Sequence, residues 1–539
     1  MAEAAVKPNL REAVSLFEAG CLMEAERLCK LLLKDNSVNV GANHLLGVSL
    51  CSRGQYKEGA DFLENVVDLQ PLNFNALRSL GDSYQCQHRH EDAVRVYRRC
   101  LSDKGSLLST YIKISICLNE LGLHDEAIRA CKAAIALSPS AFEAYFGLGS
   151  LLQDQYETDG ALIANGRSAA LAPDRPEPIT NIGLLLKESG SIDAAIAVHR
   201  HAISIFPNYA YAHINLAAGL LASGQWDEGW NEYEWRWQAQ DLGFRRPTSD
   251  KPEWTGQDLT GQTLLICEEQ GFGDTLQFIR LAALVRPLCA RVVVQCRAPL
   301  ARIIASAAGV DEVVTEFPDR SGYDCWVSLM SLMARLGVTL DSVPATTPYL
   351  FTPADARRSW ASVVPTSGTL KVGLVWAGDP KLGCAAARKM DSRRSMALSQ
   401  FAPLAQIPDV TWVSLQKGPA SKQVESAPGG LALIDPMDGV RDYADTAAII
   451  EQLDLVIGVD TSVIHLAGAL GKPVWALSRF DGCWRWLLDR DDSPWYPTLR
   501  LFRQERPGDW GPVVERVKRE LTLVAEGAGD TVLCRSEAE

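Results

Sequence analysis

Small residues and helix-ending residues recur through the first half of the chain with a period of about 34 positions. One column of small residues begins at Gly47 and another at Ala25. A third column closes successive units with residues that end helices: Pro71, Gly105, Pro139, Pro173 and Pro207. Because small residues allow two helices to approach closely, the pattern predicts stacked helix pairs. We expect an α-solenoid over residues 1–238, with six full units and a partial seventh.

Four aromatic residues change the character of the last unit. Their spacing of four, three and four positions places them on one face of a helix, and they are Trp226, Trp230, Tyr233 and Trp237. Such a stripe has a large apolar area that needs to be covered. We expect it to pack the array onto the next domain, with residues 239–262 as the linker.

From residue 262 the apolar pattern changes to short runs of strand length that alternate with helical segments. Four runs precede the proline-rich segment SVPATTPYLFTP and four follow it. This alternation predicts parallel sheets, and therefore two Rossmann-like domains at 263–365 and 366–525 that face each other across a cleft. Residues 526–539 are expected to form a flexible tail.

The composition narrows the range of functions. The chain has 539 residues and a net charge of -13, so it lacks the overall basic surface that nucleic acids or membrane surfaces require. No apolar run reaches the roughly eighteen residues of a membrane span, and the N-terminus has no signal-peptide pattern. The fourteen cysteines are scattered, without zinc-site spacing. We expect a soluble cytoplasmic protein with no nucleic-acid partner, membrane span or metal site.

The stretch EEQGFGDTLQF, residues 268–278, has the composition of a glycine-rich turn between a strand and a helix. It lacks the third glycine of a dinucleotide motif, and no acid for a ribose follows the next predicted strand. NAD binding is therefore a poor interpretation. Asp274 has one purely structural interpretation, as the cap of a helix that starts at Thr275. The next acids to consider are Glu268 and Glu269.

Two further stretches suggest anion binding. The run ARKMDSRRS follows the first strand of the second unit and places four cations within seven residues of an acidic protein: Arg388, Lys389, Arg393 and Arg394. A solvated surface is the alternative interpretation. In LDLVIGVDTSVIHLAGALGKPVWAL a buried strand leads through Asp460 and Thr461 into a short helix. Free N–H groups and a hydroxyl at that helix start favour an anion, although the same residues would also serve as a helix cap.

Together these stretches resemble a GT-B glycosyltransferase. They are similar to bacterial heptosyltransferases and, more closely, to bacterial tetratricopeptide proteins with a fused transferase domain, including flagellin glycosyltransferases. The matching stretches lie between residues 264 and 503: EEQGFGDTLQF, KVGLVWAGDP, DSRRSMAL, WVSLQKG, DTAAIIEQLDLVIGVDTSVIHLAGALGKPVW and DDSPWYPTLRLFRQ. Many relatives have a short turn with a histidine before the arginine motif. Here the corresponding turn, GDPKLGCAAARKMD, is longer and has none.

The resemblance implies roles for individual residues. Asp274 matches a general base that acts on the acceptor hydroxyl, and Gly273 beside it matches an acceptor contact. Thr461 and Ser462 match contacts to the donor diphosphate. Arg394 and Lys417 would neutralise the charge that grows on the leaving nucleotide. The implied donor contacts are Arg394, Ser395, Gln416, Lys417, Asp460, Thr461, Ser462 and His465.

The resemblance also implies that the reaction needs no metal and no cofactor. Such enzymes use no metal and no cofactor beyond the nucleotide-sugar substrate, since cations and a helix N-terminus take the place of a metal. For His465 the alternative is a hydrogen-bonded histidine within the helix.

In the array, Asn181 and Asn215 share one inner-helix column. This is similar to the asparagine ladder with which the repeats of O-linked N-acetylglucosamine transferases bind a peptide backbone. The other units carry Leu45, Ser79, Lys113 and Gly147 in that column. Any backbone clamp is therefore expected only at the C-terminal end of the array.

The leading hypothesis is an inverting transfer of a sugar from a nucleotide donor to a hydroxyl of a protein that the repeats recruit, with flagellin as one candidate acceptor. Two alternatives stay open. One is a non-catalytic repeat scaffold with a vestigial transferase domain. The other is a transferase that acts on a glycan or a lipid-linked sugar.

Overall fold

The computed structural model describes residues 9–239, 242–318, 322–366, 369–380 and 385–527. The chain divides into two compact units, Met1–Leu185 and Leu186–Glu539. The division falls inside helix α11 (Pro176–Glu188). The repeat pattern ends near residue 238, so the last helices of the array belong to the same compact unit as the sheets.

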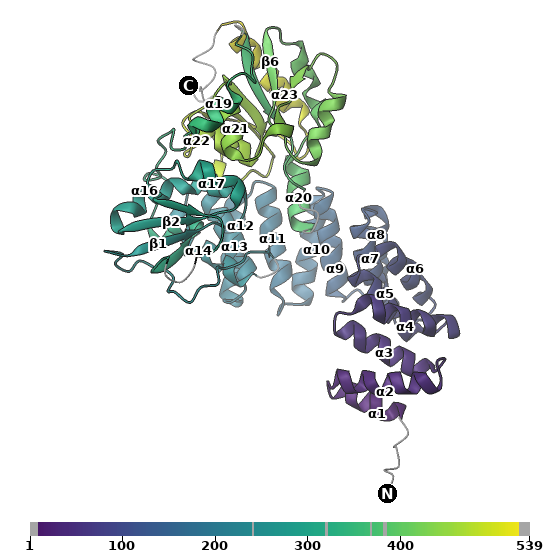
Figure 1. Cartoon of the computed structure of the whole chain (residues 1–539). Coiled ribbons are helices and arrows are strands. Elements are labelled where there is room, and N and C mark those ends of the chain that lie inside the picture. The colour runs from purple at the N-terminus through teal and green to yellow at the C-terminus, as the bar shows by residue number, and fades with distance from the viewer. Residues whose placement is uncertain (1–8, 240–241, 319–321, 367–368, 381–384, 528–539) are drawn as a thin grey trace. The chain divides into compact units, whose positions relative to one another are not determined.

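The first unit consists of TPR-like helix pairs, as the 34-residue period predicts (Figure 1). Its helices before α11 are α1 (Leu10–Glu18), α2 (Leu22–Asp35), α3 (Val40–Ser52), α4 (Tyr56–Leu69), α5 (Phe74–Cys86), α6 (His90–Cys100), α7 (Leu107–Glu120), α8 (His124–Leu137), α9 (Phe142–Asp154) and α10 (Thr158–Leu171). Asparagine is the N-cap residue of three helices, α1, α3 and α5. The Asn39 side chain accepts the Ala42 N–H at 3.0 Å, and Asn73 caps α5 in the same way.

The small columns mark places where two helices touch. A Cβ atom on Gly47 would lie 2.7 Å from Leu63 Cγ, and one on Gly81 would lie 2.4 Å from the Tyr97 ring. Both distances are shorter than a van der Waals contact, so a side chain would force the helices apart. The sequence pattern therefore follows from helix packing.

The second unit begins with the end of the array: α12 (Ile192–Ile205), α13 (Ala210–Ala222), α14 (Trp226–Tyr233) and the 3-10 turn η1 (Glu234–Gln238). The aromatic stripe packs on the sheet-containing part, as expected. Trp226 stacks on Trp495 with ring centroids 5.0 Å apart, and the Trp230 ring lies perpendicular to Phe278 at 5.6 Å. Because α14 ends at Tyr233, the fourth aromatic of the stripe lies on the 3-10 turn and not on the helix.

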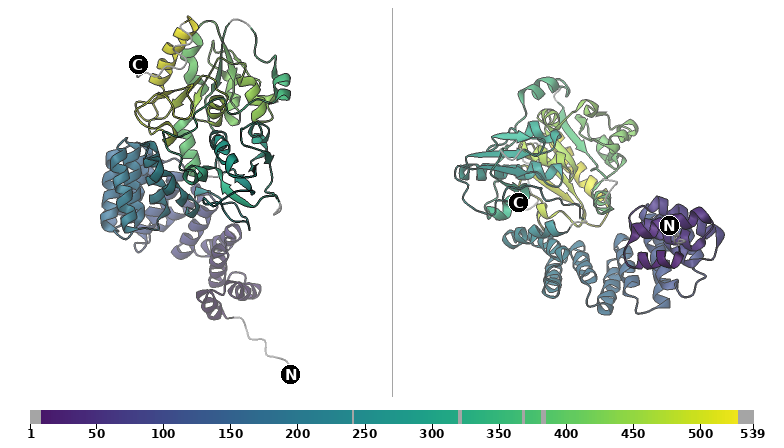
Figure 2. Two further views of the ribbon diagram at one scale, coloured as in Figure 1. Left: turned by 90° about the vertical axis from the view of Figure 1, so that its left-hand side faces the viewer. Right: turned by 60° about the horizontal axis from the view of Figure 1, so that its bottom comes forward.

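Two separate parallel sheets follow (Figure 2). The first has strand order β3-β2-β1-β4, with β1 (Thr263–Cys267), β2 (Arg291–Gln295), β3 (Glu312–Val314) and β4 (Cys325–Ser328). The second has order β10-β9-β8-β5-β6-β7, with β5 (Leu370–Val375), β6 (Val410–Ser414), β7 (Leu433–Ile434), β8 (Leu455–Val459), β9 (Val474–Ser478) and β10 (Leu499–Arg503). The eight predicted strands are present and parallel, whereas β7 and β10 were not predicted as strands.

Helices connect these strands. They are α15 (Phe272–Phe278), α16 (Ala282–Val285), α17 (Ala298–Ile304), α18 (Leu332–Arg335), α19 (Ala354–Trp360), α20 (Ala385–Arg394), α21 (Tyr443–Ile450), α22 (Ser462–Ala469) and α23 (Gly511–Ala525). The 3-10 turns are η3 (Ile279–Leu281), η4 (Arg286–Leu288), η5 (Leu329–Ser331), η6 (Leu398–Gln406), η7 (Pro419–Ser426), η8 (Met437–Gly439) and η9 (Trp484–Trp486). None of the described helices is both long and apolar enough to cross a bilayer.

Part of the predicted linker pairs with a strand of the first sheet. Within the predicted linker, the Trp254 N–H donates to the Trp326 carbonyl at 2.7 Å, and the Trp326 N–H donates to the Pro252 carbonyl at 3.1 Å. This part of the linker therefore lies along β4 and extends the first sheet. At the other end α23 finishes at Ala525, and most of the predicted tail, residues 528–539, lies outside the described residues.

A buried histidine on α12 gives the second unit a specific pH dependence. His199 is 1% exposed, and neither of its ring nitrogens has a hydrogen-bond partner in the described part of the chain. Burial, and secondarily the charge of Lys187, lowers the pKa of His199 from 6.5 to about 4. The unfolded chain therefore binds this proton more readily, and stability is lost as pH falls from about 6.5 towards 4.

We expect this residue to cost about 2 kcal/mol of unfolding free energy between about pH 7.5 and pH 5. The variant His199→Leu should lose that part of the pH dependence. Urea unfolding at several pH values measures the difference. Equal dependence in the two proteins would contradict the assignment.

Candidate functional site

The GD turn and the start of α22 are in direct contact. A Cβ atom on Gly273 would lie 2.8 Å from the His465 ring and 3.4 Å from Ser462 Cα. A side chain at Gly273 would therefore push the two helices apart. The carboxyl end of β1 and the carboxyl end of β8 thus bring Asp274 and the Asp460–Ser462 segment to the same region.

Asp274 is held on both carboxylate oxygens. It is the third residue of α15, which starts at Phe272 and not at Thr275 as the capping interpretation assumed. Its Oδ2 accepts the Gly271 N–H at 2.8 Å, and its Oδ1 binds the Arg485 guanidinium. The side chain is 16% exposed. Asp274 therefore ties down the turn that begins its own helix and also pairs with a distant cation.

Arg485 is a site residue that the sequence did not suggest. It lies on η9, 211 residues from Asp274, and its Nε donates to Gln277 Oε1 at 2.9 Å. Its guanidinium lies 4.2 Å from the Trp484 ring. Burial lowers the pKa of Arg485, but the nearby Asp274 carboxylate outweighs this and raises it above the usual range, so the cation stays charged. No local pattern marks this arginine, because its partner is brought close only by folding.

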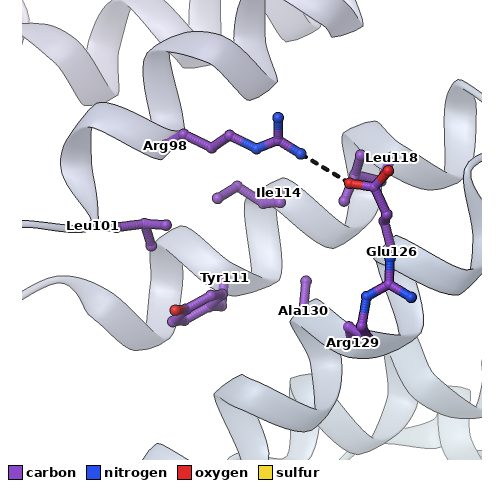
Figure 3. Close-up of a pocket in the computed structure, with 8 residues that line it drawn as sticks. All are labelled: Arg98, Leu101, Tyr111, Ile114, Leu118, Glu126, Arg129 and Ala130. Carbon is purple, nitrogen blue, oxygen red and sulfur yellow. Dashed lines mark hydrogen bonds and ion pairs between the residues drawn. The ribbon is translucent and has the colours of Figure 1, made fainter.

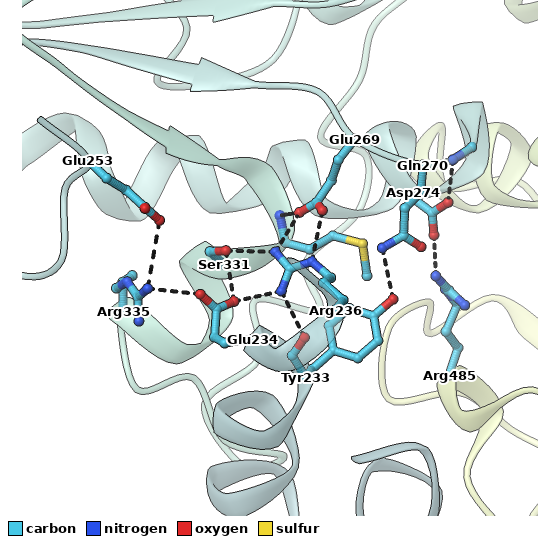
Figure 4. A network of polar contacts seen from close by, with 12 residues as sticks. Tyr233, Glu234, Arg236, Glu253, Glu269, Gln270, Asp274, Ser331, Arg335 and Arg485 are labelled. Atoms are coloured by element: carbon cyan, nitrogen blue, oxygen red, sulfur yellow. Dashed lines mark hydrogen bonds and ion pairs between the residues drawn. The ribbon is translucent and has the colours of Figure 1, made fainter. Parts of the chain in front are cut away.

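The two glutamates of the turn have structural partners, and those of Glu269 are drawn in Figure 4. Glu269 accepts two hydrogen bonds from Arg236, at 3.0 and 3.1 Å, and a third from the Met330 N–H at 2.9 Å. Glu268 pairs with Arg297 after β2. The next residue, Gln270, donates to the Tyr233 hydroxyl at 2.8 Å. Neither glutamate is free to replace Asp274 as a base.

Arg236 ties the end of the array to this turn. It is fully buried on η1 and also binds Glu234 at 2.7 Å and the Ser331 hydroxyl at 2.7 Å (Figure 4). Burial raises the pKa of Glu269, while the Arg236 charge opposes that change. Arg236 thus forms one network with Glu234, Glu269 and Ser331. We call this set the buried network.

Thr461 begins α22 with an unsatisfied hydroxyl. It occupies the N-cap position and is 9% exposed, and its Oγ1 is buried with no hydrogen-bond partner among the described residues. Ser462 beside it shares a hydrogen bond of 2.6 Å with the Tyr443 hydroxyl. A buried hydroxyl without a partner is costly, and at a helix N-terminus it is placed to bind an anion. Thr461 therefore does not act as the simple side-chain cap that the alternative interpretation required.

Asp460 and His465 are enclosed by aromatic residues. Asp460 Oδ2 accepts the Trp486 Nε1–H at 3.2 Å, and its Oδ1 lies 3.7 Å from His465 Nε2. His465 is buried, bonds the Tyr496 hydroxyl at 3.0 Å and stacks on the Trp486 ring. Burial raises the pKa of Asp460, but His465 and then Arg485 and Arg394 outweigh it and hold that pKa well below its usual range. These bonds fit an orienting role for both residues, and equally the alternative of a hydrogen-bonded helix histidine.

The basic run lies on α20 and divides into two parts. Arg394 donates from Nε to Asp391 at 3.1 Å and from Nη1 to the Asp460 carbonyl at 3.1 Å. Arg393 instead binds Glu188 at 2.6 Å and Asp481 at 3.4 Å. Arg394 thus lies beside the Asp460–Ser462 segment, whereas its neighbour holds α20 against the end of α11. Four residues of the long turn that precedes this run, 381–384, lie outside the described residues.

Ser395, Gln416 and Lys417 surround the carboxyl end of β5. The Ser395 hydroxyl accepts the Gly378 N–H at 2.9 Å. Gln416 uses its whole amide group on backbone atoms: it accepts from Trp376 and Ala377 and donates to the carbonyls of Ala377 and Lys417. Lys417 is exposed and donates to the Val440 carbonyl. Gln416 therefore positions the loop after β5. Both hydrogens of its amide group are already used, so none is left to bind a nucleotide sugar.

The two predicted asparagines of the array are half-buried. Asn181 lies on α11 and Asn215 on α13, and the division between the compact units separates them. The first unit also has an open pocket between α6, α7 and α8 (Figure 3). It is lined by Arg98, Leu101, Tyr111, Ile114, Leu118, Glu126, Arg129 and Ala130. Arg98 and Glu126 form an ion pair of 2.9 Å at this pocket.

The segments that follow β1 and β8 contribute different chemical groups. The segment after β1 contributes a carboxylate, Asp274. The segment after β8 contributes a helix start with the unpartnered Thr461 hydroxyl and the nearby cation Arg394. Within the described residues, no group of three or more His, Cys, Asp and Glu side chains is arranged to hold a metal ion. A carboxylate next to a helix start with an unpartnered hydroxyl and a nearby cation suits transfer of a group from a phosphate to a hydroxyl.

Comparison with known proteins gives partial matches. No family model matches the chain. Protein FlbA of Caulobacter vibrioides is 29% identical over 330 residues, which is 56% of this chain and 53% of that protein. The chain thus spans about half the length of the curated relative it matches.

Solved structures match about a third of the chain. MamA 41-end from Desulfovibrio magneticus RS-1 is 17% identical with a TM-score of 0.28, over 30% of this chain and 92% of its own. YrrB, described as a TPR protein with an unusual peptide-binding site, is 17% identical with a TM-score of 0.29, over 34% of this chain and 95% of its own. Each of these matches covers only part of this chain.

Proposed function

We propose that the chain is a GT-B glycosyltransferase that moves a sugar, with inversion, from a nucleotide-sugar donor to a hydroxyl of a protein recruited by the repeats. The observation that carries this proposal is the buried, unpartnered Thr461 hydroxyl at the start of α22, with Arg394 bound to the adjacent Asp460 carbonyl. A nucleotide phosphate would satisfy that hydroxyl. It would also gain the helix N–H groups and the arginine charge.

In the proposed reaction, Asp274 and the cations Arg394 and Lys417 have separate roles. Asp274 would accept the proton of the acceptor hydroxyl as its oxygen attacks the anomeric carbon from the face opposite the nucleotide. The bond from that carbon to the nucleotide phosphate oxygen breaks, and the electron pair leaves with the phosphate. Arg394 and the exposed Lys417 would balance the charge that develops there, so the chain's own cations supply the stabilisation.

The acceptor is the least constrained part of the proposal. The TPR-like pairs suit a peptide or protein, and Asn181 and Asn215 are the proposed backbone contacts, with flagellin as one candidate acceptor. A glycan or lipid-linked acceptor is the second form of the same activity. The non-catalytic scaffold is favoured by one observation: Arg485 and the Gly271 N–H already occupy the two carboxylate oxygens of Asp274.

Nucleotide binding tests the proposal. Adenosine, cytidine, guanosine and uridine mono- and diphosphates, with their common sugar conjugates, would be screened for a rise in melting temperature. Calorimetry of the best nucleotide should then show that Arg394→Ala weakens affinity by ~1.5 to 3 kcal/mol, the range of a charge-assisted hydrogen bond. Thr461→Val should weaken it by ~0.5 to 1.5 kcal/mol without lowering stability, since valine removes a buried polar atom that has no partner.

The matched control is Arg519→Ala, which removes an exposed arginine from α23 in the same part of the chain. It should leave both affinity and stability unchanged. If no nucleotide in the panel binds, or if affinity is the same in all three variants, the nucleotide site is placed wrongly.

A further inference from the structure

One segment of the second unit contacts carboxylates on both sides of the site. On η9, Arg485 binds Asp274 through Nη2 and Gln277 through Nε, and both partners lie on α15. The next residue, Trp486, donates from Nε1 to Asp460 Oδ2 at 3.2 Å. Two consecutive side chains thus join the proposed base to the segment that leads into the proposed nucleotide site.

The charge of Arg485 reaches both carboxylates. Its side chain is 12% exposed, so water screens it little. It lowers the pKa of Asp460 as well as pairing with Asp274, although burial acts on Asp460 in the opposite direction. A phosphate group beside Thr461 would add negative charge next to Asp460. A planar guanidinium binds phosphate oxygens in pairs, so such a group would compete with Asp274 for it.

The same ion pair occupies the oxygen that Asp274 would need as a base. Proton transfer from a hydroxyl requires a carboxylate oxygen within hydrogen-bond reach of that hydroxyl, and Asp274 Oδ1 instead binds Arg485. The other oxygen of Asp274 has a separate partner, the Gly271 N–H, which does not involve the arginine. Loss of Arg485 from Asp274 would therefore free one oxygen and leave the carboxylate in position.

We propose that Arg485 is a positioning residue that exchanges one anion for another. Without nucleotide it binds Asp274, and the phosphate of a bound nucleotide draws it away and frees Asp274 to accept the proton. The inference rests on the proposed function, which it deepens by making nucleotide binding the event that activates the base. It gives a binding order in which the nucleotide precedes a productive acceptor.

A double-mutant cycle tests this exchange by binding alone. Calorimetry would compare the wild-type chain, Asp274→Asn, Arg485→Gln and the double variant, using the nucleoside phosphate that binds the wild type best and, in parallel, inorganic pyrophosphate. Asp274→Asn releases the arginine in advance, so affinity should rise about three- to tenfold. Arg485→Gln should lower affinity about tenfold. In the Arg485→Gln background, Asp274→Asn should no longer raise it.

Glu268→Gln is the matched control, because it removes a carboxylate from the same turn whose partner is Arg297. Its affinity should equal that of the wild type. Equal affinity in Asp274→Asn and the wild type, an equal rise in Glu268→Gln, or a rise that persists without Arg485 would each overturn the exchange while the nucleotide site stands. A wild-type chain that binds none of the probes would instead overturn the proposed function. If Arg485→Gln does not fold, the comparison of Asp274→Asn with Glu268→Gln still decides the question.

Discussion

Replacing Asp274 by asparagine is expected to lower the rate of sugar transfer by about 10² to 10⁴-fold, the usual contribution of a general base. Asparagine keeps the size of the side chain and an oxygen that can accept the Gly271 N–H, so the turn should keep its shape. Nucleotide affinity should not fall, because the lost group acts on the acceptor side. The measurement is initial transfer rate at saturating acceptor, with calorimetry of the nucleotide in parallel.

The structural interpretation of Asp274 makes the opposite prediction. If the residue only holds the start of α15, asparagine would serve almost equally well and transfer would stay near the wild-type rate. The control is Asp324→Asn, since Asp324 accepts the Thr263 N–H at 2.7 Å on the first sheet in a similar way. That variant should transfer normally. Near-normal transfer by Asp274→Asn would remove the base from the mechanism, and the paired Glu268 and Glu269 offer no ready substitute.

Replacing Arg236 by methionine should destabilise the second unit by about 3 to 5 kcal/mol, because it leaves the buried Glu269 carboxylate without its cation. The measurement is urea unfolding followed by tryptophan fluorescence. The exposed pair between Arg291 and Glu312 provides the control. There Arg291→Met should cost about 0 to 1 kcal/mol, as is typical of surface ion pairs.

The double variant Arg236→Met with Glu269→Leu separates two explanations. If the cost of the single variant comes from an unpaired buried charge, removing both charges should recover most of it. If the loss persists in full, the network is needed for its geometry and not for charge balance. A cost below about 1 kcal/mol for the single variant would contradict the network's assigned role.

Local periodicity made much of the fold predictable. The helix pairs follow from small residues such as Gly47, whose column reflects direct helix contact. Eight strands follow from apolar runs. Strand β10 was not predicted, because Arg500, its second residue, interrupts the apolar run, and only the folded structure supplies the Glu520 partner of that arginine at 3.2 Å. The basic run was placed after the strand that is now β5, and the structure shows that it lies on α20 (Ala385–Arg394).

The candidate site was predictable where a residue's role depends on its own element. Thr461 follows a buried strand and begins a helix, and that order is legible in the sequence. Arg485 was not predictable, because its relation to Asp274 spans 211 positions and depends on the packing of η9 against α15. Gln416 looked like a donor contact, but its amide is spent on the backbone after β5. Sequence patterns therefore located strand ends and helix starts more reliably than the partners of each side chain.

The division inside α11 also bears on how such a chain can change over evolutionary time. Units of about 34 residues can be duplicated or lost in Met1–Leu185 with each new unit meeting only its neighbours. The helices α13 and α14 are constrained differently, because Trp226 stacks on Trp495 and Trp230 packs on Phe278. Substitutions in these last repeats would have to be accompanied by changes in the sheets. Recombination between related chains would therefore be tolerated best at the beginning of α11, and the final repeats would be inherited together with the two sheets.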